Sequence, residues 1–201
     1  MARRSLQHPS RRDLIATVAA SGLGLSAFDV AGAAEDLPPT PACHDGDQPT
    51  MAETEGPFFK PNSPERSDLR EKGMPGEPVW LIGFVLSRRC RPVGKALVEL
   101  WHADDKGEYD NAGFRLRGHQ LTGADGRYGF RTIVPGLYVP RTRHYHVKVQ
   151  APGKPVLTTQ LYFPDEPGNA RDGLFRPELT MRMTHAEDGL QAHFDIVLDL
   201  G

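Results

Sequence analysis

The chain has 201 residues, of which 24 are Lys or Arg and 26 are Asp or Glu, so its formal net charge is −2 at pH 7. Charge this evenly balanced creates no long-range field that would gather nucleic acid or hold the protein on an anionic membrane, and we expect neither partner. The 21 Gly and 18 Pro residues separate short β-branched or aromatic runs, which favours an all-β domain with many turns.

The N-terminal residues are typical of an export signal. Arg11 and Arg12 precede an apolar stretch at residues 16–28, and small residues follow at 31–34. This order is similar to that of twin-arginine signals, and the apolar stretch is too short to anchor the protein in a bilayer. We therefore predict a signal segment at residues 1–33 and a periplasmic or secreted protein. The alternative is a basic amphipathic helix of the mature protein.

The next segment reads as an extended arm. Residues 34–77 hold many Pro, Gly and charged positions without a sustained period, so we expect an N-terminal arm that wraps the domain formed by residues 78–201. Cys43 and Cys90 are the only cysteines of the chain. An oxidising compartment would let them pair, and we predict a disulfide, with two unpaired thiols as the alternative.

From Val79 onward the pattern changes to short apolar runs bounded by Gly, Pro or Asp-Gly. Runs of strand length occupy residues 79–86, 96–102, 128–133, 145–150, 158–163 and 191–198. Short strands at this spacing predict a β-sandwich. The connection from Pro164 to Met183 is long for a compact domain, so we predict a long C-terminal loop that is a candidate to cover a functional site.

His144 and His146 stand at the start of one predicted strand, with Tyr145 between them. The two-residue period places both imidazoles on one face with backbones about 6.5–7 Å apart, close enough to converge on one metal ion. By the same alternation Tyr145 points away, and we assign it to packing. Two histidines do not complete a metal site, so a half-exposed polar face is the alternative for this pair taken alone.

The histidines close a longer motif, Pro135-Gly136-Leu137-Tyr138-Val139-Pro140-Arg141-Thr142-Arg143-His144-Tyr145-His146, and Gly107-Glu108-Tyr109 precedes it. Together they resemble the intradiol ring-cleavage dioxygenases in their short exported form. Further family-like segments occur in the same order: Cys43, Thr54-Glu55-Gly56-Pro57-Phe58-Phe59, Cys90-Arg91-Pro92, Trp101-His102-Ala103-Asp104, Leu116-Arg117-Gly118 and Thr159-Gln160-Leu161-Tyr162-Phe163. The resemblance therefore extends from about Cys43 to Phe163.

The resemblance implies a metal centre with four protein ligands, which are Tyr109, Tyr138, His144 and His146, around one Fe(III) ion per chain. The chemistry of these residues agrees with that set. Phenolates are hard, anionic donors that suit Fe(III), and a bound multivalent cation stabilises the deprotonated phenol. In isolation, either tyrosine is better explained as a turn residue that covers the edge of the sandwich.

The resemblance also assigns roles to residues around the metal. Arg141 and Tyr138 would be catalytic, because Arg141 steadies negative charge during oxygen attack and Tyr138 leaves the metal when the substrate binds. Arg141 and Gln160 would contact the substrate. Arg143 adjoins the first histidine and is expected to be a rim or salt-bridge residue, and His102 is expected to be structural or to support the ligands.

The implied reaction is intradiol (ortho) cleavage of a catechol-type diol with O2 to a muconate-type diacid, a step of aromatic compound catabolism. Catechol, hydroxyquinol, protocatechuate and larger aromatic fragments are all candidate substrates, and a homo-oligomer is compatible with the sequence. Two alternatives remain. Residues 94–99 and 124–130 also resemble transthyretin-like binding modules, and the histidine pair alone would suit a periplasmic copper or zinc carrier.

Overall fold

The computed structural model describes Cys43 and residues 48–201, and the predicted signal segment at 1–33 lies outside the described residues, as do positions 34–42 and 44–47 of the predicted arm. The strands are β1 (Pro78–Ser87), β2 (Leu97–Trp101), β3 (Arg117–Leu121), β4 (Arg127–Ile133), β5 (His144–Gln150), β6 (Leu157–Tyr162), β7 (Arg182–Ala186), β8 (Gly189–His193) and β9 (Ile196–Leu198). Two short 3-10 turns, η1 (Asn169–Arg171) and η2 (Pro177–Leu179), lie between β6 and β7. Within the described residues, no helix is long and apolar enough to cross a membrane.

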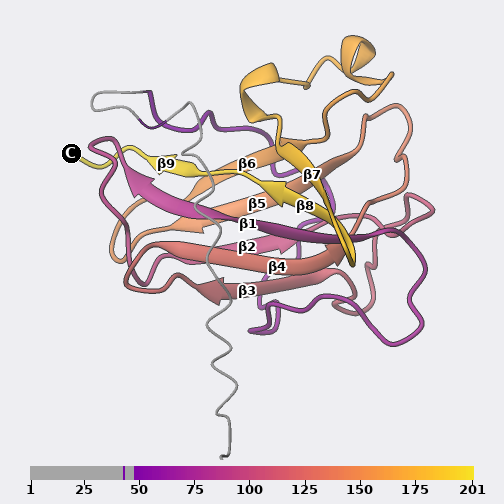
Figure 1. The fold of residues 1–201 in the computed structure, drawn as a ribbon, viewed down its shortest axis with the longest axis horizontal. Helices are drawn as coiled ribbons and strands as arrows, with labels where there is room; N and C mark the ends of the chain where they lie inside the picture. Colours follow the sequence, from indigo (N-terminus) through magenta and orange to yellow (C-terminus); the bar gives the residue numbers. More distant parts are fainter. Residues whose placement is uncertain (1–42, 44–47) are drawn as a thin grey trace, which may run out of the picture. The chain divides into compact units, whose positions relative to one another are not determined.

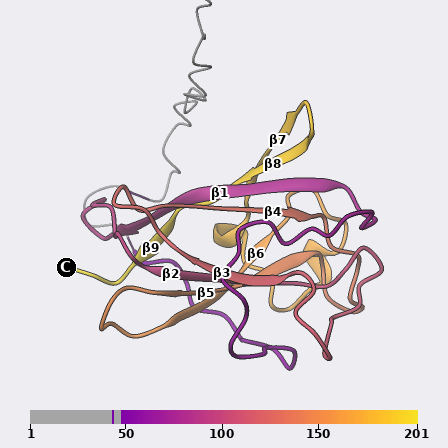
Figure 2. The same ribbon diagram turned by 90° about the horizontal axis from the view of Figure 1, so that it is seen from below.

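The strands form two sheets packed face to face, as Figures 1 and 2 show from two directions. One sheet has the order β4-β1-β8-β7, with β9 also paired to β1, and the other has the order β3-β2-β5-β6. Figure 2 separates β1 and β4 in one layer from β2, β3 and β5 in the other. The predicted β-sandwich is confirmed.

Alternating side chains of the two sheets fill the space between the layers. Leu81 and Val85 of β1 face the interior from one sheet, and Leu100, Tyr145 and Val147 face it from the other. This is the period-two pattern that a half-buried strand requires, and it leaves the alternate side chains of β5 on the outer face of their sheet.

The predicted single strand at 191–198 is wrong, because it is two strands. β8 and β9 both pair in parallel with β1 and keep one register, but the ladder breaks at Asp195. There the side-chain oxygen Oδ1 of Asp195 accepts the backbone N–H of Phe84 at 2.9 Å, so a carboxylate replaces a ladder carbonyl. The apolar pattern continues through this point, which explains why the sequence conceals the interruption.

Two strands were not predicted. β3 begins with Arg117-Gly118-His119-Gln120, and β7 reads Arg182-Met183-Thr184-His185-Ala186, so neither contains a run of β-branched residues. Both lie at the edge of a sheet and pair with one strand, β2 and β8 respectively, and His119 of β3 also bonds to the backbone of the arm at Pro64 and Arg66. Their strand geometry therefore depends on tertiary pairing rather than on local propensity.

The described part of the predicted arm, residues 48–77, runs along the sandwich and is fixed at several places. Its backbone bonds to both layers, through Thr50 N to Val197 O at 2.8 Å and Glu53 N to Thr158 O at 2.9 Å. Near its start, Cys43 and Cys90 form a disulfide with their Cα atoms 5.5 Å apart. The arm is thus attached to the domain by backbone bonds and by one covalent bond.

His102 follows β2 and is completely enclosed. Its Nδ1 lies 2.7 Å from the carbonyl of Ala103 and its Nε2 lies 2.6 Å from the hydroxyl of Thr132. Burial lowers the pKa of His102 to about 4, so the imidazole is neutral at pH 7. The expectation that His102 has a structural role agrees with these contacts.

We predict that His102 makes the fold sensitive to acid. Because its pKa is about 4 in the folded protein and near 6.5 in an unfolded chain, the unfolded state binds one more proton between these values. The contribution is fully present above pH 6.5 and is lost as the pH falls to 4, at a cost of about 3 kcal/mol. Urea unfolding between pH 7 and 4 measures the free energy of unfolding at each pH. Its slope against pH should correspond to one proton fewer in a His102→Asn variant than in the wild type. Equal slopes would contradict the prediction.

Candidate metal centre

The predicted site residues gather on the outer face of the four-stranded sheet. His146 of β5 lies opposite Gln160 of β6 on one side and opposite Trp101 of β2 on the other, and Trp101 lies opposite Arg117 of β3. Residues directly opposite each other in neighbouring strands share a face, so these side chains form one row across the sheet. The ring of Trp101 stacks on the imidazole of His146, with centroids 5.0 Å apart.

Three of the four predicted ligands converge on one point. The hydroxyl of Tyr109 lies 3.1 Å from His146 Nε2 and 3.4 Å from His144 Nε2, and the two Nε2 atoms are 3.2 Å apart. His144 Nδ1 lies 2.6 Å from the carbonyl of Thr142. A carbonyl can only accept, so Nδ1 carries the proton and Nε2 of His144 turns a lone pair toward the other two ligands.

Tyr138 lies beside this group but is more open. Its ring is 5.8 Å from that of Tyr109 and nearly perpendicular to it, and the residue is 38% exposed. The structure therefore brings the four predicted ligands into one neighbourhood, with Tyr109, His144 and His146 in direct contact and Tyr138 at the rim. Tyr145 points the other way, into the core, where its hydroxyl donates to the carbonyl of Ile133 at 2.9 Å.

Burial sets the charge state of these groups. It lowers the pKa of His144 to about 4 and lowers the pKa of His146 well below its usual value, so both imidazoles are neutral at pH 7. It also raises the pKa of Tyr109, although the charges of Arg141 and Arg117 oppose that rise. Neutral imidazoles are the form that binds metals, and the phenol requires a nearby cation to ionise.

The arm covers the row of side chains. Phe58 stacks on Tyr109 with ring centroids 4.4 Å apart and meets the ring of Tyr138 edge-on at 5.2 Å. A Cβ atom at Gly56 would lie 3.2 Å from the imidazole of His146, so glycine lets the backbone approach this closely. The arm thus forms one wall of the site, over His146 and the two tyrosines.

Arg117 of β3 binds the backbone of the arm at Phe58. It is 1% exposed, and its guanidinium donates to the carbonyls of Phe58 at 2.6 Å and Asp110 at 3.2 Å. Its second terminal nitrogen is buried and has no hydrogen-bond partner among the described residues. A charged group that bonds only to neutral carbonyls is unusual in a protein interior. Through these two bonds, Arg117 holds the arm against the loop that carries Tyr109.

Arg141 and Gln160 bond to each other, as residues of one site should. The terminal Nη2 of Arg141 donates to Gln160 Oε1 at 2.7 Å, and Gln160 Nε2 donates to the carbonyl of Thr54 in the arm at 2.9 Å. Gln160 is fully buried. Gln160 therefore connects the guanidinium of Arg141 with the part of the arm that covers the predicted ligands.

The long connection between β6 and β7 is drawn in gold in Figure 1, and its side chains bond to the segment that leads into the histidine pair. Its residue Asp172 faces Arg141 Nε with both carboxylate oxygens, at 2.8 and 3.0 Å. Its residue Glu166 faces Arg143 Nη1 with both oxygens at 2.7 Å, so Arg143 is a salt-bridge residue as expected. The loop therefore supports the site through both arginines, and it also contacts the arm, where Arg176 pairs with Glu53 at 3.3 Å.

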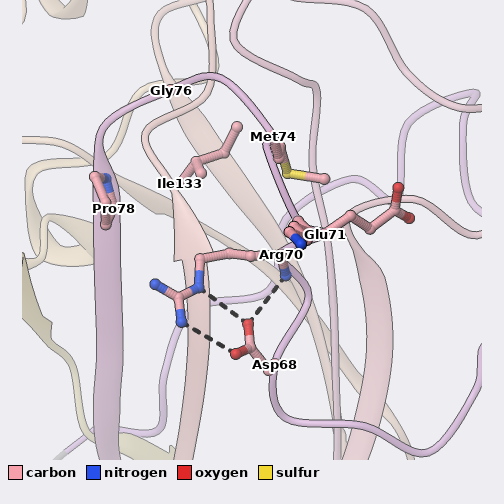
Figure 3. A pocket seen from close by; sticks show the side chains of 8 residues that line it. Asp68, Arg70, Glu71, Met74, Gly76, Pro78 and Ile133 are labelled. Carbon is pink, nitrogen blue, oxygen red and sulfur yellow. Dashed lines mark hydrogen bonds and ion pairs between the residues drawn. The ribbon is translucent and has the colours of Figure 1, made fainter.

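The hollow shown in Figure 3 is a separate feature, with a volume of about 310 Å³. Its lining residues are Asp68, Arg70, Glu71, Lys72, Met74, Gly76, Pro78 and Ile133, none of which is a predicted site residue. Asp68 and Arg70 satisfy each other through two side-chain bonds of 3.0 Å, which leaves no unpaired charge between them to attract a ligand.

Sequence reasoning missed three contributors to the site, which are Phe58, Arg117 and Asp172. Phe58 and Arg117 stand in segments that resemble the family, but neither residue type signals a role by itself. Asp172 stands in a loop 31 residues beyond Arg141, and no periodicity or motif links the two positions. Only the fold shows that they meet.

Comparison with known proteins places these residues in a family. Residues 54–200 match the profile of the Dioxygenase family (Dioxygenase_C). The hydroxyquinol 1,2-dioxygenase of Nocardioides simplex is 34% identical over 150 residues, which cover 63% of this chain and 51% of that protein. The chain thus spans about half the length of the curated relatives it matches.

Comparison with solved structures also finds dioxygenases. The dioxygenase domain of a dioxygenase carbohydrate-binding protein fusion from Streptomyces sp. SirexAA-E is 54% identical, with a TM-score of 0.75, and the match covers 77% of this chain and all of that domain. The 3-chlorocatechol 1,2-dioxygenase of Rhodococcus opacus 1CP is 26% identical with a TM-score of 0.70, covering 76% of this chain and 74% of that chain. Because the family match spans well over half of the chain and includes Tyr109, Tyr138 and both histidines, the chain belongs to the intradiol ring-cleavage dioxygenases.

Proposed function

We propose that the protein is a non-haem iron(III) dioxygenase that cleaves a catechol-type diol with O2 between its two hydroxyl-bearing carbons, giving a muconate-type diacid. The observation that carries this proposal is the convergence of Tyr109, His144 and His146 beside Tyr138, in a position covered by the arm. Catechol and hydroxyquinol, which the names of curated relatives contain, are the first diols to test.

The residues fit one iron ion per chain. Among residues 43 and 48–201, no group of three or more His, Cys, Asp or Glu side chains is placed to hold a metal ion, so the convergent set depends on tyrosine. Two neutral imidazoles and two phenols that become phenolates supply hard donors of the kind that Fe(III) prefers. The carbonyl of Thr142 fixes the tautomer of His144, as a supporting group around a metal site does.

When bound, the iron would supply Lewis acidity and electron transfer for reaction of the diol with O2. The protein would supply position, charge and exclusion of water. Tyr138, exposed at the rim, can turn outward and accept a proton as the diol enters, whereas Tyr109 is held under Phe58. Arg141 would stabilise negative charge that develops on the substrate, with Gln160 holding its guanidinium.

The two alternatives are not favoured. A transthyretin-like binding module has no need for two tyrosines beside two histidines, and a carrier of copper or zinc would not require an arginine bonded to the buried Gln160. The family match over residues 54–200 also includes the positions that either alternative leaves unexplained.

We also propose export through the twin-arginine route to the periplasm or beyond. Arg11 and Arg12 with the apolar stretch that follows support it, as does the Cys43–Cys90 disulfide, which suits an oxidising compartment. That route carries folded proteins, so iron could be inserted in the cytoplasm before export.

The first prediction from this proposal concerns the metal. Because tyrosinate bound to Fe(III) absorbs visible light by charge transfer, the purified protein should be red to burgundy, contain one iron per chain and lose the colour when iron is removed. His146→Ala should lose the metal, and Tyr109→Phe should weaken the visible band. Metal analysis with visible spectra measures both. A colourless protein with stoichiometric zinc would contradict the proposal.

The second prediction separates the two neighbouring arginines. Arg141→Ala should keep the iron and its colour but slow ring cleavage by about a hundredfold or more, since arginine is not a ligand but offsets charge in the transition state. Arg143→Ala should change turnover little, because Arg143 is bonded to Glu166 and Pro135 at the rim. Oxygen uptake with catechol and hydroxyquinol measures the rates.

A control for this comparison is Arg141→Gln, which keeps an N–H donor for the buried Asp172 and so limits damage to the fold. It should be nearly as slow as Arg141→Ala. If Arg143→Ala abolished turnover while both Arg141 variants stayed active, the assignment of roles along residues 138–146 would be wrong.

The third prediction concerns export. Replacing Arg11 and Arg12 by lysine keeps the charge but removes the guanidinium pair that the twin-arginine receptor reads. We expect the periplasmic yield to fall sharply and the protein to accumulate in the cytoplasm, as measured by immunoblotting of cell fractions. An unchanged periplasmic yield would show that the segment is not such a signal.

A further inference from the structure

The loop between β6 and β7 bonds to three consecutive residues immediately ahead of the histidine pair. The contacts are Asp172 with Arg141, Asn169 with Thr142 and Glu166 with Arg143. The central one matters for the ligands as well, because the carbonyl of Thr142 orients His144. A loop that was noticeable in the sequence only for its length therefore fixes the entry into the site.

Asp172 differs in its surroundings from Glu166, the residue of this loop that pairs with Arg143. Its side chain is 3% exposed, and besides Arg141 it accepts the backbone N–H groups of Thr142 and Leu174, both at 3.0 Å. Glu166 is 15% exposed and bonds to the guanidinium of Arg143. Asp172 is thus itself held rigidly, and a rigid carboxylate can impose a direction on the group that it binds.

The bonds of Arg141 show which direction is imposed. Its Nε donates to the carboxylate of Asp172. Its Nη2 donates to Gln160 Oε1 at 2.7 Å and to the hydroxyl of Tyr162 at 3.3 Å. Two sides of the planar guanidinium are therefore fixed. Its Nη1 has no hydrogen bond to any residue in the described part of the chain, and it remains the one donor that a substrate could use.

We propose that Asp172 is a positioning residue for ring cleavage: it acts through Arg141, holding the guanidinium so that Nη1 stays directed at the substrate. The inference rests on the proposed function, since it assigns Arg141 its role in the reaction. Among the described residues, Asp172 forms no hydrogen bond with Tyr109, Tyr138, His144 or His146, and its side-chain partners are Arg141 and the backbone of Thr142 and Leu174. Its place in the loop far from the histidines in sequence explains why the motif that contains Arg141 does not include its partner.

The test compares Asp172→Asn with Glu166→Gln. Both variants remove one negative charge from the same loop and from a salt bridge to one of two neighbouring arginines, so effects of net charge and loop stability are shared. In metal-free protein, the Nε–H proton of Arg141, assigned by its loss in Arg141→Lys, should exchange slowly with water in the wild type and in Glu166→Gln. It should exchange at least about tenfold faster in Asp172→Asn, because the carboxylate no longer protects it.

Kinetics of the iron-loaded protein provide the second measurement. Asp172→Asn should lower kcat for ring cleavage by about tenfold, with iron content and visible colour retained, whereas Glu166→Gln should stay near the wild-type rate. In an Arg141→Lys background, Asp172→Asn should lower kcat little further, since residues that act as one unit are not additive. Asp172→Glu, which keeps the charge, should recover part of the rate.

Each result decides the question. Equal exchange rates of the Arg141 proton in Asp172→Asn and Glu166→Gln, or equal kcat values, would overturn the inference, as would full additivity with Arg141→Lys. If Asp172→Asn fails to fold, the exchange rate and kcat of Asp172→Glu against the wild type decide in its place, and unchanged values would overturn it. Wild-type protein that binds iron but cleaves none of the diols would instead refute the proposed function, while the exchange measurement would still report on the Arg141–Asp172 contact.

Discussion

Strand β5 contributes side chains to the hydrophobic core from one face and to the candidate metal centre from the other, and this double use explains why the site needs a cover. Tyr145, Val147 and Val149 fill the core, so His144 and His146 must lie on the outer face, where a sheet normally meets water. Yet both histidines are almost fully buried. A covering layer is therefore required, and it is assembled from the arm, the loop that carries Tyr109 and the segment that carries Tyr138.

That covering layer has little regular structure, so its polar backbone groups need partners from elsewhere. Side chains of the sheet provide several of them: Gln160 donates to the carbonyl of Thr54, and Arg117 donates to the carbonyls of Phe58 and Asp110. A buried carbonyl without a partner costs on the order of 1–3 kcal/mol. These hydrogen bonds give the carbonyl groups of the arm their partners and also fix Phe58 over the predicted ligands. Loss of one bond would therefore affect both the stability of the arm and the geometry of the site.

The sequence could predict those parts of the molecule that depend on local pattern. The alternation in β5 separated His144 and His146 from Tyr145, and short apolar runs located β1, β2, β4, β5 and β6. It could not predict β3 or β7, whose residues become strands only through their partners, nor the break at Asp195, where a side chain replaces a backbone acceptor. The ligand residues were found by motif, whereas Phe58 and Asp172 contribute through contacts across the fold that leave no local signal.

The two arginines near Tyr109 differ in burial and in how their charge is compensated, since Arg117 is 1% exposed and the side chain of Arg141 is 16% exposed. Arg141 is paired with Asp172, whose side chain is 3% exposed, and removing the guanidinium would leave that carboxylate without its compensating charge. Arg117 bonds only to neutral carbonyls, and burial lowers its pKa while the negative charge of Asp110 opposes that shift. Both positive charges lower the pKa of Tyr109 against the effect of burial. Of the two charges, that of Arg141 lowers the pKa of Tyr109 more and that of Arg117 less, so both arginines favour a phenolate at Tyr109 and its ionisation depends on the same guanidinium that Asp172 holds.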